Sequence, residues 1–357
     1  MANNGNVQII DPVNDDRWDR YVESHPFGWI CHLSGWKKML ESTFPHIKGH
    51  YLALLDSNGN IQAALPVFEV RSWLLGNRMV SIPFATLCDP LITINAHVDK
   101  LLKKTMDLSD EHRCSHIEIR TLQAAQFVEN SHFSSTNFYK HHYLSLDQEP
   151  AQLMKSFHRT NVRQRIQRAI DSGVHIQTGS SESDLANFFA LHVQTRKKLH
   201  LPPQPFQFFR MLWNTFHATG QMVLMLAGLE GQIIAGLILF KFKNRVSAEF
   251  LASDERFLNV SPNHLLFWEA IKSSREEGFK IFDFGRTSAN NESLMTFKSR
   301  WGTKVVDLRN FYYPKDMAAH VTKREESISY KFISQICSHS STPTLLRIGR
   351  ICYRHLG

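Results

Sequence analysis

The stretch YLALLDSNGNIQAALPVFEV at residues 51–70 predicts two apolar strands joined by a tight turn. Its centre, SNGN at 57–60, supplies residues that tolerate a positive φ, which a hairpin turn demands. The stretch MLAGLEGQIIAGLILFKF at 225–242 has the same arrangement, with a glutamate and a glycine at the turn. The sequence therefore predicts two equivalent β-hairpins that lie far apart in the chain.

A second pair of similar segments follows the hairpins in the same order. EHRCSHIEIR at 111–120 and EEGFKIFDFGR at 276–286 both pass from a charged helix end into a short strand of alternating apolar and acidic residues. A helical stretch precedes each of them, at 98–107 and at 262–277. Two matching patterns about 165–175 residues apart indicate an internal duplication. The alternative is a chance match between generic α/β segments.

The length and composition of the chain agree with two domains. A chain of 357 residues exceeds one ordinary core, and 43% hydrophobic with 21% charged residues is typical of folded proteins. We therefore expect an α/β (α+β) fold in which residues 1–150 and 151–315 each form a mixed sheet flanked by helices, and in which these two domains superimpose. Residues 316–357 are expected to form a basic, amphipathic helical tail.

The composition also predicts the compartment and the charge of the partner. No stretch approaches the ~18–20 apolar residues that span a bilayer, and the polar, acidic N-terminus does not have the pattern of a secretory signal. The five cysteines form no CxxC pair and no HExxH spacing occurs, so we expect a cytoplasmic protein with reduced thiols and no metal. A formal charge of +8 predicts an anionic partner, or else serves only solubility.

The segment LMKSFHRTNVRQRIQRAIDS at 153–172 predicts one amphipathic helix, which Gly173 ends. Its apolar face comprises Leu153, Phe157, Val162, Ile166, Ala169 and Ile170. Another face carries basic residues from Lys155 to Arg168, with no acidic residue between them. We expect three of these, Arg159, Arg163 and Arg165, to bind a phosphorylated substrate; the alternative is a solvated linker.

A further helix is expected to begin at Ser261-Pro262, shortly after a strand at 246–252. Free backbone N–H groups and the positive end of the helix dipole favour an anion at such a junction. We therefore expect Ser261 and Asn263 to contact an anionic cofactor, although no glycine-rich phosphate loop accompanies them. The alternative is a plain strand–helix junction.

The segment FDFGRTSANNESLMTFKSRWGT at 282–303 supplies most of the other candidate site residues. Arg286 follows the end of a strand, where ligands of α/β sheets gather. Lys298 lies among aromatic residues, so its ammonium can hold a phosphate or stabilise a developing oxyanion, and Phe297 and Trp301 are expected to bind substrate beside it. The alternative is a solvated lysine in a surface loop.

Two residues are candidate general bases, Asp283 in the strand and His264 in the preceding helix. Asp283 is alternatively a structural acceptor for neighbouring N–H groups. For Lys298 we expect an exposed side chain whose truncation costs under ~0.5 kcal/mol of stability.

Three segments resemble FemAB-type transferases and their acyltransferase relatives in the GNAT superfamily. They are SPNHLLFWEAI with GFKIFDFGRTSANNESLMTFKSRWGT, the helix HRTNVRQRIQRAIDSGV, and LPVFEVRSWLLGNRMVSIPF of the first half. The resemblance covers about residues 10–315 and is strongest to the branch associated with exopolysaccharide and exosortase systems. It implies that Lys298 matches the lysine of a Phe-Lys motif near the reacting carbonyl, and that Arg163 and Arg165 face an anionic substrate or donor. Where the family often has a glycine-rich turn, this chain has ANNES at 289–293.

The resemblance also implies a fold and an activity. FemAB proteins carry two GNAT-like domains and transfer amino acids from aminoacyl-tRNA to an amine of a peptidoglycan precursor. We therefore expect two tandem GNAT-like domains and an N-acyltransferase that uses acyl-CoA or aminoacyl-tRNA as cosubstrate. The implied acceptor is an amine of a small-molecule or lipid-linked cell-envelope or polysaccharide precursor, and tRNA is an implied partner. The alternative is a non-catalytic GNAT-like module that recruits an anionic envelope precursor or RNA.

The tail has its own pattern, in which apolar residues between Ile328 and Leu356 recur at roughly helical spacing with basic residues among them. Short basic amphipathic helices of this kind can lie in an anionic membrane interface. The sequence therefore predicts peripheral contact with the inner membrane face, or else a cap that packs on the second domain.

Overall fold

The computed structural model describes residues 6–129, 131–322 and 328–356, so residues 1–5, 130, 323–327 and 357 of the expected domains and tail lie outside it. The chain forms two compact units. Unit 1 comprises Met1–Phe138, Asp307–Tyr330 and Ile351–Gly357, and unit 2 comprises Tyr139–Val306 and Lys331–Arg350. Each unit thus contains segments that are distant in sequence, whereas the sequence predicted the continuous ranges 1–150, 151–315 and 316–357.

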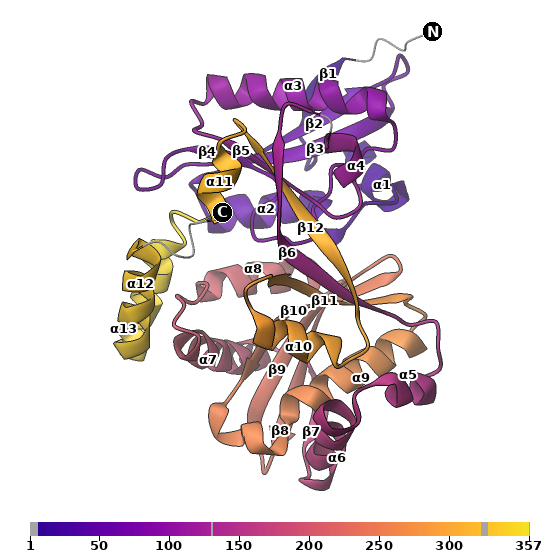
Figure 1. Cartoon of the computed structure of the whole chain (residues 1–357), viewed down its shortest axis with the longest axis vertical. Coiled ribbons are helices and arrows are strands. Elements are labelled where there is room, and N and C mark those ends of the chain that lie inside the picture. Colours follow the sequence, from indigo (N-terminus) through magenta and orange to yellow (C-terminus); the bar gives the residue numbers. More distant parts are fainter. Residues whose placement is uncertain (1–5, 130, 323–327, 357) are drawn as a thin grey trace. The chain divides into compact units, whose positions relative to one another are not determined.

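The chain runs twice through one order of elements (Figure 1). The first series is β1 (Val7–Ile10), α1 (Asp16–Ser24), α2 (Ser34–Thr43), β2 (Ile47–Leu55), β3 (Ile61–Val70), β4 (Arg78–Val80), α3 (Asn95–Glu111), β5 (Ile117–Thr121), α4 (Ala125–Val128) and β6 (Ser134–Ser145). The second series is β7 (His175–Gly179), α7 (Glu182–Lys198), α8 (Phe206–Phe216), β8 (Met222–Leu229), β9 (Gln232–Phe242), β10 (Arg245–Ser253), α9 (Pro262–Glu276), β11 (Ile281–Ser288), α10 (Glu292–Ser299) and β12 (Lys304–Tyr313).

The remaining elements lie between, within or after the two series. Between them are α5 (Pro150–Ser156), the π-helical turn η2 (Arg159–Arg163) and α6 (Gln164–Asp171). Short 3-10 helices, η1 (Ile30–His32) and η3 (Glu255–Val260), precede α2 and α9. The second series is followed by α11 (Met317–Thr322), α12 (Ile328–His339) and α13 (Thr342–Cys352).

The strands of the two units pair in the same way. In unit 1, β1 to β4 are antiparallel in sequence order, β4 is parallel to β5, and β5 is antiparallel to β12. In unit 2, β7 to β10 are antiparallel in sequence order, β10 is parallel to β11, and β11 is antiparallel to β6. Strands β6 and β12 have therefore exchanged sheets, which is why the units are discontinuous. The predicted hairpins and the repeated order of elements are confirmed, and the superposition of the two series stays a prediction.

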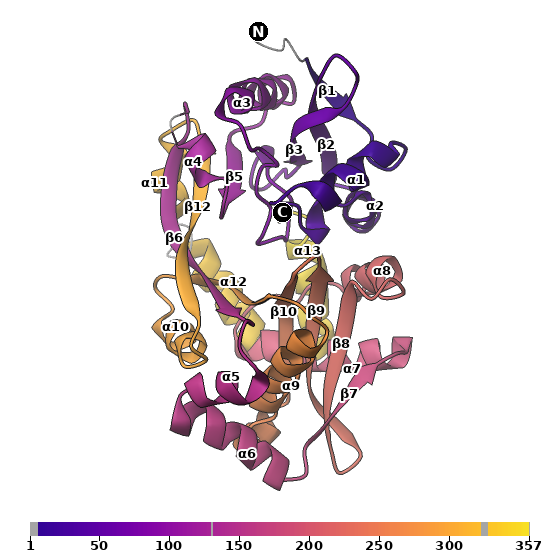
Figure 2. The ribbon, with the colours of Figure 1, turned by 90° about the vertical axis from the view of Figure 1, so that its right-hand side faces the viewer.

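Helices cover both faces of the sheet in unit 1, with α3 on one face and α1 and α2 on the other (Figure 2). Alternate residues of β2 and β3, such as Leu52 and Leu65, are buried in one cluster with Leu101 and Leu108 of α3. Since full burial of each leucine contributes roughly 1.5–3 kcal/mol, this apolar face fixes the register of the hairpin against the helix.

The single basic helix expected at 153–172 is in fact broken between α5 and η2. Phe157 is extended and buried, with its ring 5.2 Å from that of Trp301, and the backbone N–H of His158 donates to the carbonyl of Arg300 at 2.9 Å. Five of the six predicted apolar residues are buried, but Ile170 is 49% exposed. The end of the segment is as predicted, because Gly173 follows α6 with a φ of +79°.

Some of the described side chains of the tail pack on the protein. In unit 2, Cys337 and Leu345 are buried in a cluster with Val193 of α7. In unit 1, Arg78 donates to the carbonyl of His355 at 2.8 Å, and the ring of Tyr353 lies 5.6 Å from that of Phe84. The contact with Val193 corresponds to the predicted cap on the second domain, whereas the contacts with Arg78 and Phe84 were not predicted. The side chains of residues 320–332, which include Ile328 and Phe332, are outside the described part.

Candidate functional site

The candidate site of unit 2 lies where strands β10 and β11 part. Only Arg245–Ser247 and Ile281–Asp283 pair, although β10 continues to Ser253 and β11 to Ser288. Both strands are irregular at this point, with register shifts at 248/250 on β10 and at 283/285 on β11. Gly285 has a φ of +71°, which L side chains rarely adopt. Such bulges bend a strand and re-aim its side chains, and they are frequent next to active sites.

Asp283 is the buried anchor of the site. One carboxylate oxygen lies 2.8 Å from Nη1 of Arg245 and 2.9 Å from Nε2 of His141, and the other accepts from the N–H of Gly285 at 2.6 Å. Burial alone would raise the pKa of Asp283, but His141, Arg245 and the Gly285 N–H together lower it to about 2. A carboxylate this acidic is a poor base near neutral pH, so these contacts favour the structural-acceptor role.

Lys298 of α10 is buried, with only 6% exposure, so the expectation of an exposed lysine is wrong. Its ammonium donates to the backbone carbonyls of Gly285 and Arg286, each at 3.0 Å. Burial lowers the pKa of Lys298 to about 8, although Asp283 and Glu249 act in the opposite direction. Because an ammonium has three N–H groups and two of them donate to these carbonyls, the third can donate to a ligand.

Glu249, on the β10 bulge, belongs to the same cluster and was missed from the sequence. It is partly exposed and accepts a hydrogen bond from Oγ of Ser247 at 2.5 Å. Desolvation raises the pKa of Glu249 to about 7; the Ser247 hydrogen bond and Lys298 lower it, and Asp283 raises it. A single acidic residue inside the apolar strand expected at 246–252 is the signal that could have identified it. A carboxyl group that titrates near neutral pH can accept a proton from a substrate.

His264 of α9 and Trp301 lie together in an aromatic cluster of unit 2. The rings stack with centroids 6.0 Å apart, and Phe297 lies 5.7 Å from His264. Burial, and then the charge of Arg165, lower the pKa of His264 to about 4, so the imidazole is neutral at pH 7. Trp301 is completely buried, and its predicted contact with substrate stays a prediction.

Ser261 and Asn263 occupy the predicted helix start. Ser261 immediately precedes α9 with a φ of +61°, and its hydroxyl makes no capping hydrogen bond. Among the described residues, Oγ of Ser261 and Oδ1 of Asn263 are buried without a hydrogen-bond partner. Since buried polar atoms are normally paired, these two fit the polar part of a bound ligand.

The four candidate arginines differ in their surroundings. Arg159 is exposed on η2, and Arg165 lies close enough to His264 to lower its pKa. Arg163 is half-buried, and its Nε is buried with no hydrogen-bond partner in the described part of the chain. Arg286 is exposed at the end of β11, with its guanidinium 4.8 Å from the ring centroid of Tyr139. Arg163 and Arg165 are therefore better placed than Arg159 to hold an anion.

Reversing the charge of Arg163 is expected to weaken the binding of a phosphorylated ligand. Arg163→Glu should reduce affinity and lower the slope of log K against log salt by about 1, because one phosphate contact is lost. Titration at several salt concentrations measures both. The matched control is Arg168→Glu, an exposed arginine of α6 that undergoes the same change of charge. Equal effects of the two substitutions would mean that the helix contributes only diffuse charge.

Comparison with known proteins identifies the class of this fold. Residues 156–299, which contain β10, β11 and α10, match the family described as Acetyltransferase (GNAT) domain. Unit 2 therefore contains a GNAT domain. The crystal structure of FemX superimposes with a TM-score of 0.69 at 16% identity and covers 88% of this chain and 99% of its own. A tandem GNAT protein from the clavulanic acid biosynthesis pathway has a TM-score of 0.56 at 11% identity, over 86% of this chain and 97% of its own.

One similar protein has a described activity. The chain is 21% identical over 315 residues to the UDP-N-acetylmuramoylpentapeptide-lysine N(6)-alanyltransferase of Weissella viridescens. The aligned region covers 82% of this chain and 90% of the alanyltransferase. The likenesses confirm the predicted tandem GNAT fold and the resemblance to FemAB-type proteins. None of the helices in residues 6–129, 131–322 and 328–356 is long and apolar enough to cross a membrane.

Proposed function

We propose that this protein is a FemAB-like N-acyltransferase that transfers an acyl or aminoacyl group to an amine of a cell-envelope or polysaccharide precursor. The observation that carries the proposal is the position of Lys298, whose buried ammonium is held by Gly285 and Arg286 where β10 and β11 part. The GNAT match spans this region, and the Weissella viridescens relative is an alanyltransferase that acts on a lysine N(6).

The proposed chemistry requires one cation and one proton acceptor. The acceptor amine attacks the carbonyl carbon of the activated ester or thioester, and negative charge develops on the carbonyl oxygen. The ammonium of Lys298 donates to that oxygen, which a buried cation stabilises far more than an exposed one. Glu249 accepts the proton of the amine and returns it to the leaving alkoxide or thiolate as the intermediate collapses. Asp283 orients the site through its contacts with His141, Arg245 and Gly285.

The donor is the part of the proposal that a binding experiment decides. Unpaired atoms on Ser261, Asn263 and Arg163 favour a donor with polar and anionic groups, and both acyl-CoA and aminoacyl-tRNA meet this description. Thermal shift with acetyl-CoA, longer acyl-CoAs and a stable aminoacyl-tRNA analogue separates these donors. A shift confined to one class supports transfer and selects the donor. The absence of any shift, with binding of an envelope precursor alone, would favour the non-catalytic recruiting module.

The pH dependence of transfer is expected to be bell-shaped. Glu249 must be deprotonated to accept a proton, so kcat/KM falls as the pH drops through about 7. Lys298 must be protonated to stabilise the oxyanion, so kcat/KM also falls as the pH rises through about 8. Glu249→Gln should abolish the acidic limb. It should retain a basic limb, moved to lower pH because the charge of Glu249 raises the pKa of Lys298. Initial rates between pH 5 and 10 measure both limbs. An unchanged acidic limb in this variant would remove Glu249 from the proton transfer.

We also propose that α12 brings the protein to a lipid-linked acceptor. Ile333 and Ile336 are one helical turn apart and are 37% and 38% exposed, and Arg347 and Arg350 are exposed on α13. Ile333→Asn with Ile336→Asn should therefore reduce sedimentation with anionic vesicles and leave the Tm unchanged, because these side chains are not in the core. Failure of the unsubstituted protein to sediment with such vesicles would contradict the membrane contact.

A further inference from the structure

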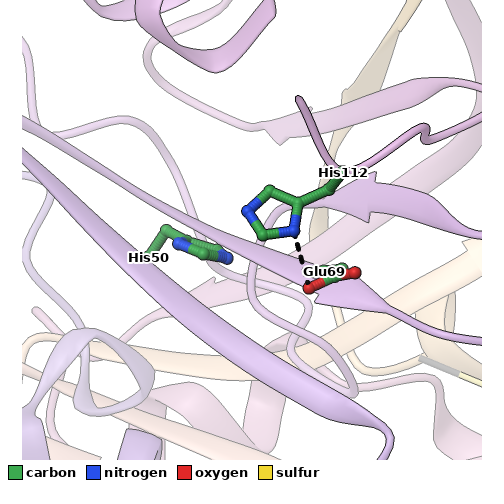
Figure 3. Close-up of side chains that lie close together, drawn as sticks. All are labelled: His50, Glu69 and His112. Atoms are coloured by element: carbon green, nitrogen blue, oxygen red, sulfur yellow. Dashed lines mark ion pairs between the residues drawn. The ribbon is translucent and has the colours of Figure 1, made fainter. Parts of the chain in front are cut away.

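Three residues of unit 1 that are distant in sequence meet at one end of α3 (Figure 3). His50 lies on β2, Glu69 lies on β3, and His112 follows the last residue of α3. His50 pairs with Val67 and Lys48 pairs with Glu69, so His50 and Glu69 are diagonal neighbours on the same face of the hairpin. Each of the three residues offers one ligand atom, and these atoms all lie within 4.8 Å of one another.

His50 is the least satisfied member of this cluster. It is only 7% exposed, and its Nε2 is buried without a hydrogen-bond partner among the described residues. A buried ring nitrogen without a partner costs free energy, so it calls for an explanation. The imidazole rings of His50 and His112 lie close together, with centroids 5.0 Å apart (Figure 3).

The separation of the other two members fits an ion pair and is also compatible with two ligands of one metal ion. Nδ1 of His112 lies 3.2 Å from Oε2 of Glu69. Ligands at ~2.0–2.1 Å from a tetrahedral Zn²⁺ are separated by about 3.3 Å. Two imidazoles and one carboxylate are also a set of ligands that zinc uses when its fourth position holds water. His112 is 22% exposed, so that position can be reached by water.

Arg71 is the competing partner of Glu69. Its guanidinium contacts the carboxylate through Nε at 2.8 Å and Nη2 at 3.0 Å, and the arginine side chain is 58% exposed. An ion pair with Arg71 and His112 satisfies Glu69 but leaves Nε2 of His50 without a partner. A cation bound to Nε2 accounts for all three residues, and Arg71 then orients the carboxylate from outside, as hydrogen-bonded neighbours of metal ligands do.

We propose that His50, Glu69 and His112 bind one divalent transition-metal ion per chain, with Zn²⁺ as the ion that the ligand set fits. The ion ties the end of α3 to the β2–β3 hairpin and so stabilises unit 1. This site is separate from the transfer site, because all three residues belong to unit 1 and the transfer residues belong to unit 2. Sequence spacing did not reveal it, since the three ligands come from three different elements.

The test uses full-length protein without a purification tag, because a polyhistidine tag would bind metal itself. The protein is stripped with a chelator, incubated with Zn²⁺ or Co²⁺ and dialysed, and metal content and Tm are measured. We expect one metal ion per chain, a visible Co²⁺ absorption typical of four-coordinate sites, and a Tm rise of about 5 °C or more at saturating Zn²⁺. His112→Gln and Glu69→Gln should lose the bound ion and the Tm rise.

The control is His97→Ala, a histidine near the start of the same helix that does not belong to the cluster. This variant should keep the ion. His112→Gln replaces a partly exposed residue, so it tests the site even if a substitution of buried His50 prevents folding. Metal content that is near zero in the unsubstituted protein, or that is unchanged in His112→Gln and Glu69→Gln, would overturn the proposal.

Discussion

Lys298→Met is expected to reduce turnover by ~10²-fold or more, which is the usual cost of losing one oxyanion donor. Methionine keeps the apolar stem of the side chain and removes the ammonium that donates to Gly285 and Arg286. The loss should be in kcat with little change in KM, because the interaction strengthens only as charge develops on the carbonyl oxygen. Steady-state rates with the donor selected by thermal shift measure this effect.

The same substitution has a structural cost that must be separated from the catalytic one. Two backbone carbonyls lose their donor inside the unit, so Lys298→Met should destabilise the fold by roughly 1–3 kcal/mol. Rates are therefore compared at a temperature well below the Tm of both proteins. Lys272→Met, at a 41% exposed lysine of α9, is the matched control and should retain full activity. Near-normal kcat in folded Lys298→Met would exclude the lysine from the transfer step.

Asp283→Asn is expected to destabilise the protein by ~3–5 kcal/mol, since it breaks a buried ion pair from one side. Arg245, whose side chain is only 13% exposed, would lose its charged partner. The fully buried His141 would lose its contact with the carboxylate. The asparagine oxygen can still accept from the Gly285 N–H, so the bulge need not collapse. Urea denaturation at pH 7 gives the difference in the free energy of unfolding.

The pH dependence of that difference tests its origin. The pKa of Asp283 is lowered from 3.8 to about 2 in the folded protein, so its ionised form stabilises the fold above pH 3.8. This contribution is lost as the pH falls through about 2, and the gap between Asp283→Asn and the unsubstituted protein should narrow there. Asp171→Asn, at an exposed aspartate of α6, is the control and should cost under ~0.5 kcal/mol. A similar cost for both substitutions would show that Asp283 is not an anchor.

Local patterns in the sequence were sufficient to predict the main elements. The hairpin turns at 57–60 and 230–231, the helix start at Pro262 and the end of α6 before Gly173 depend on neighbouring residues only. These turns and helix ends can be predicted because φ preferences and apolar periodicity act within a few residues. The break after Ser156 was missed, because burial of Phe157 against Trp301 overrides the helical periodicity of the segment.

The sequence by itself determined the class of this protein: two repeated α/β series, a basic segment between them, and a Phe-Lys pair at the end of the second. Only the tertiary structure decided which residues share a site. The exchange of β6 and β12 sets His141 against Asp283, and the bulge on β10 brings Glu249 into the surroundings of Lys298. Strand register and the packing of distant elements control these contacts, and neither leaves a periodic signal in the chain. For the same reason the sequence did not predict the cluster of His50, Glu69 and His112, which meet only when α3 packs on the first hairpin.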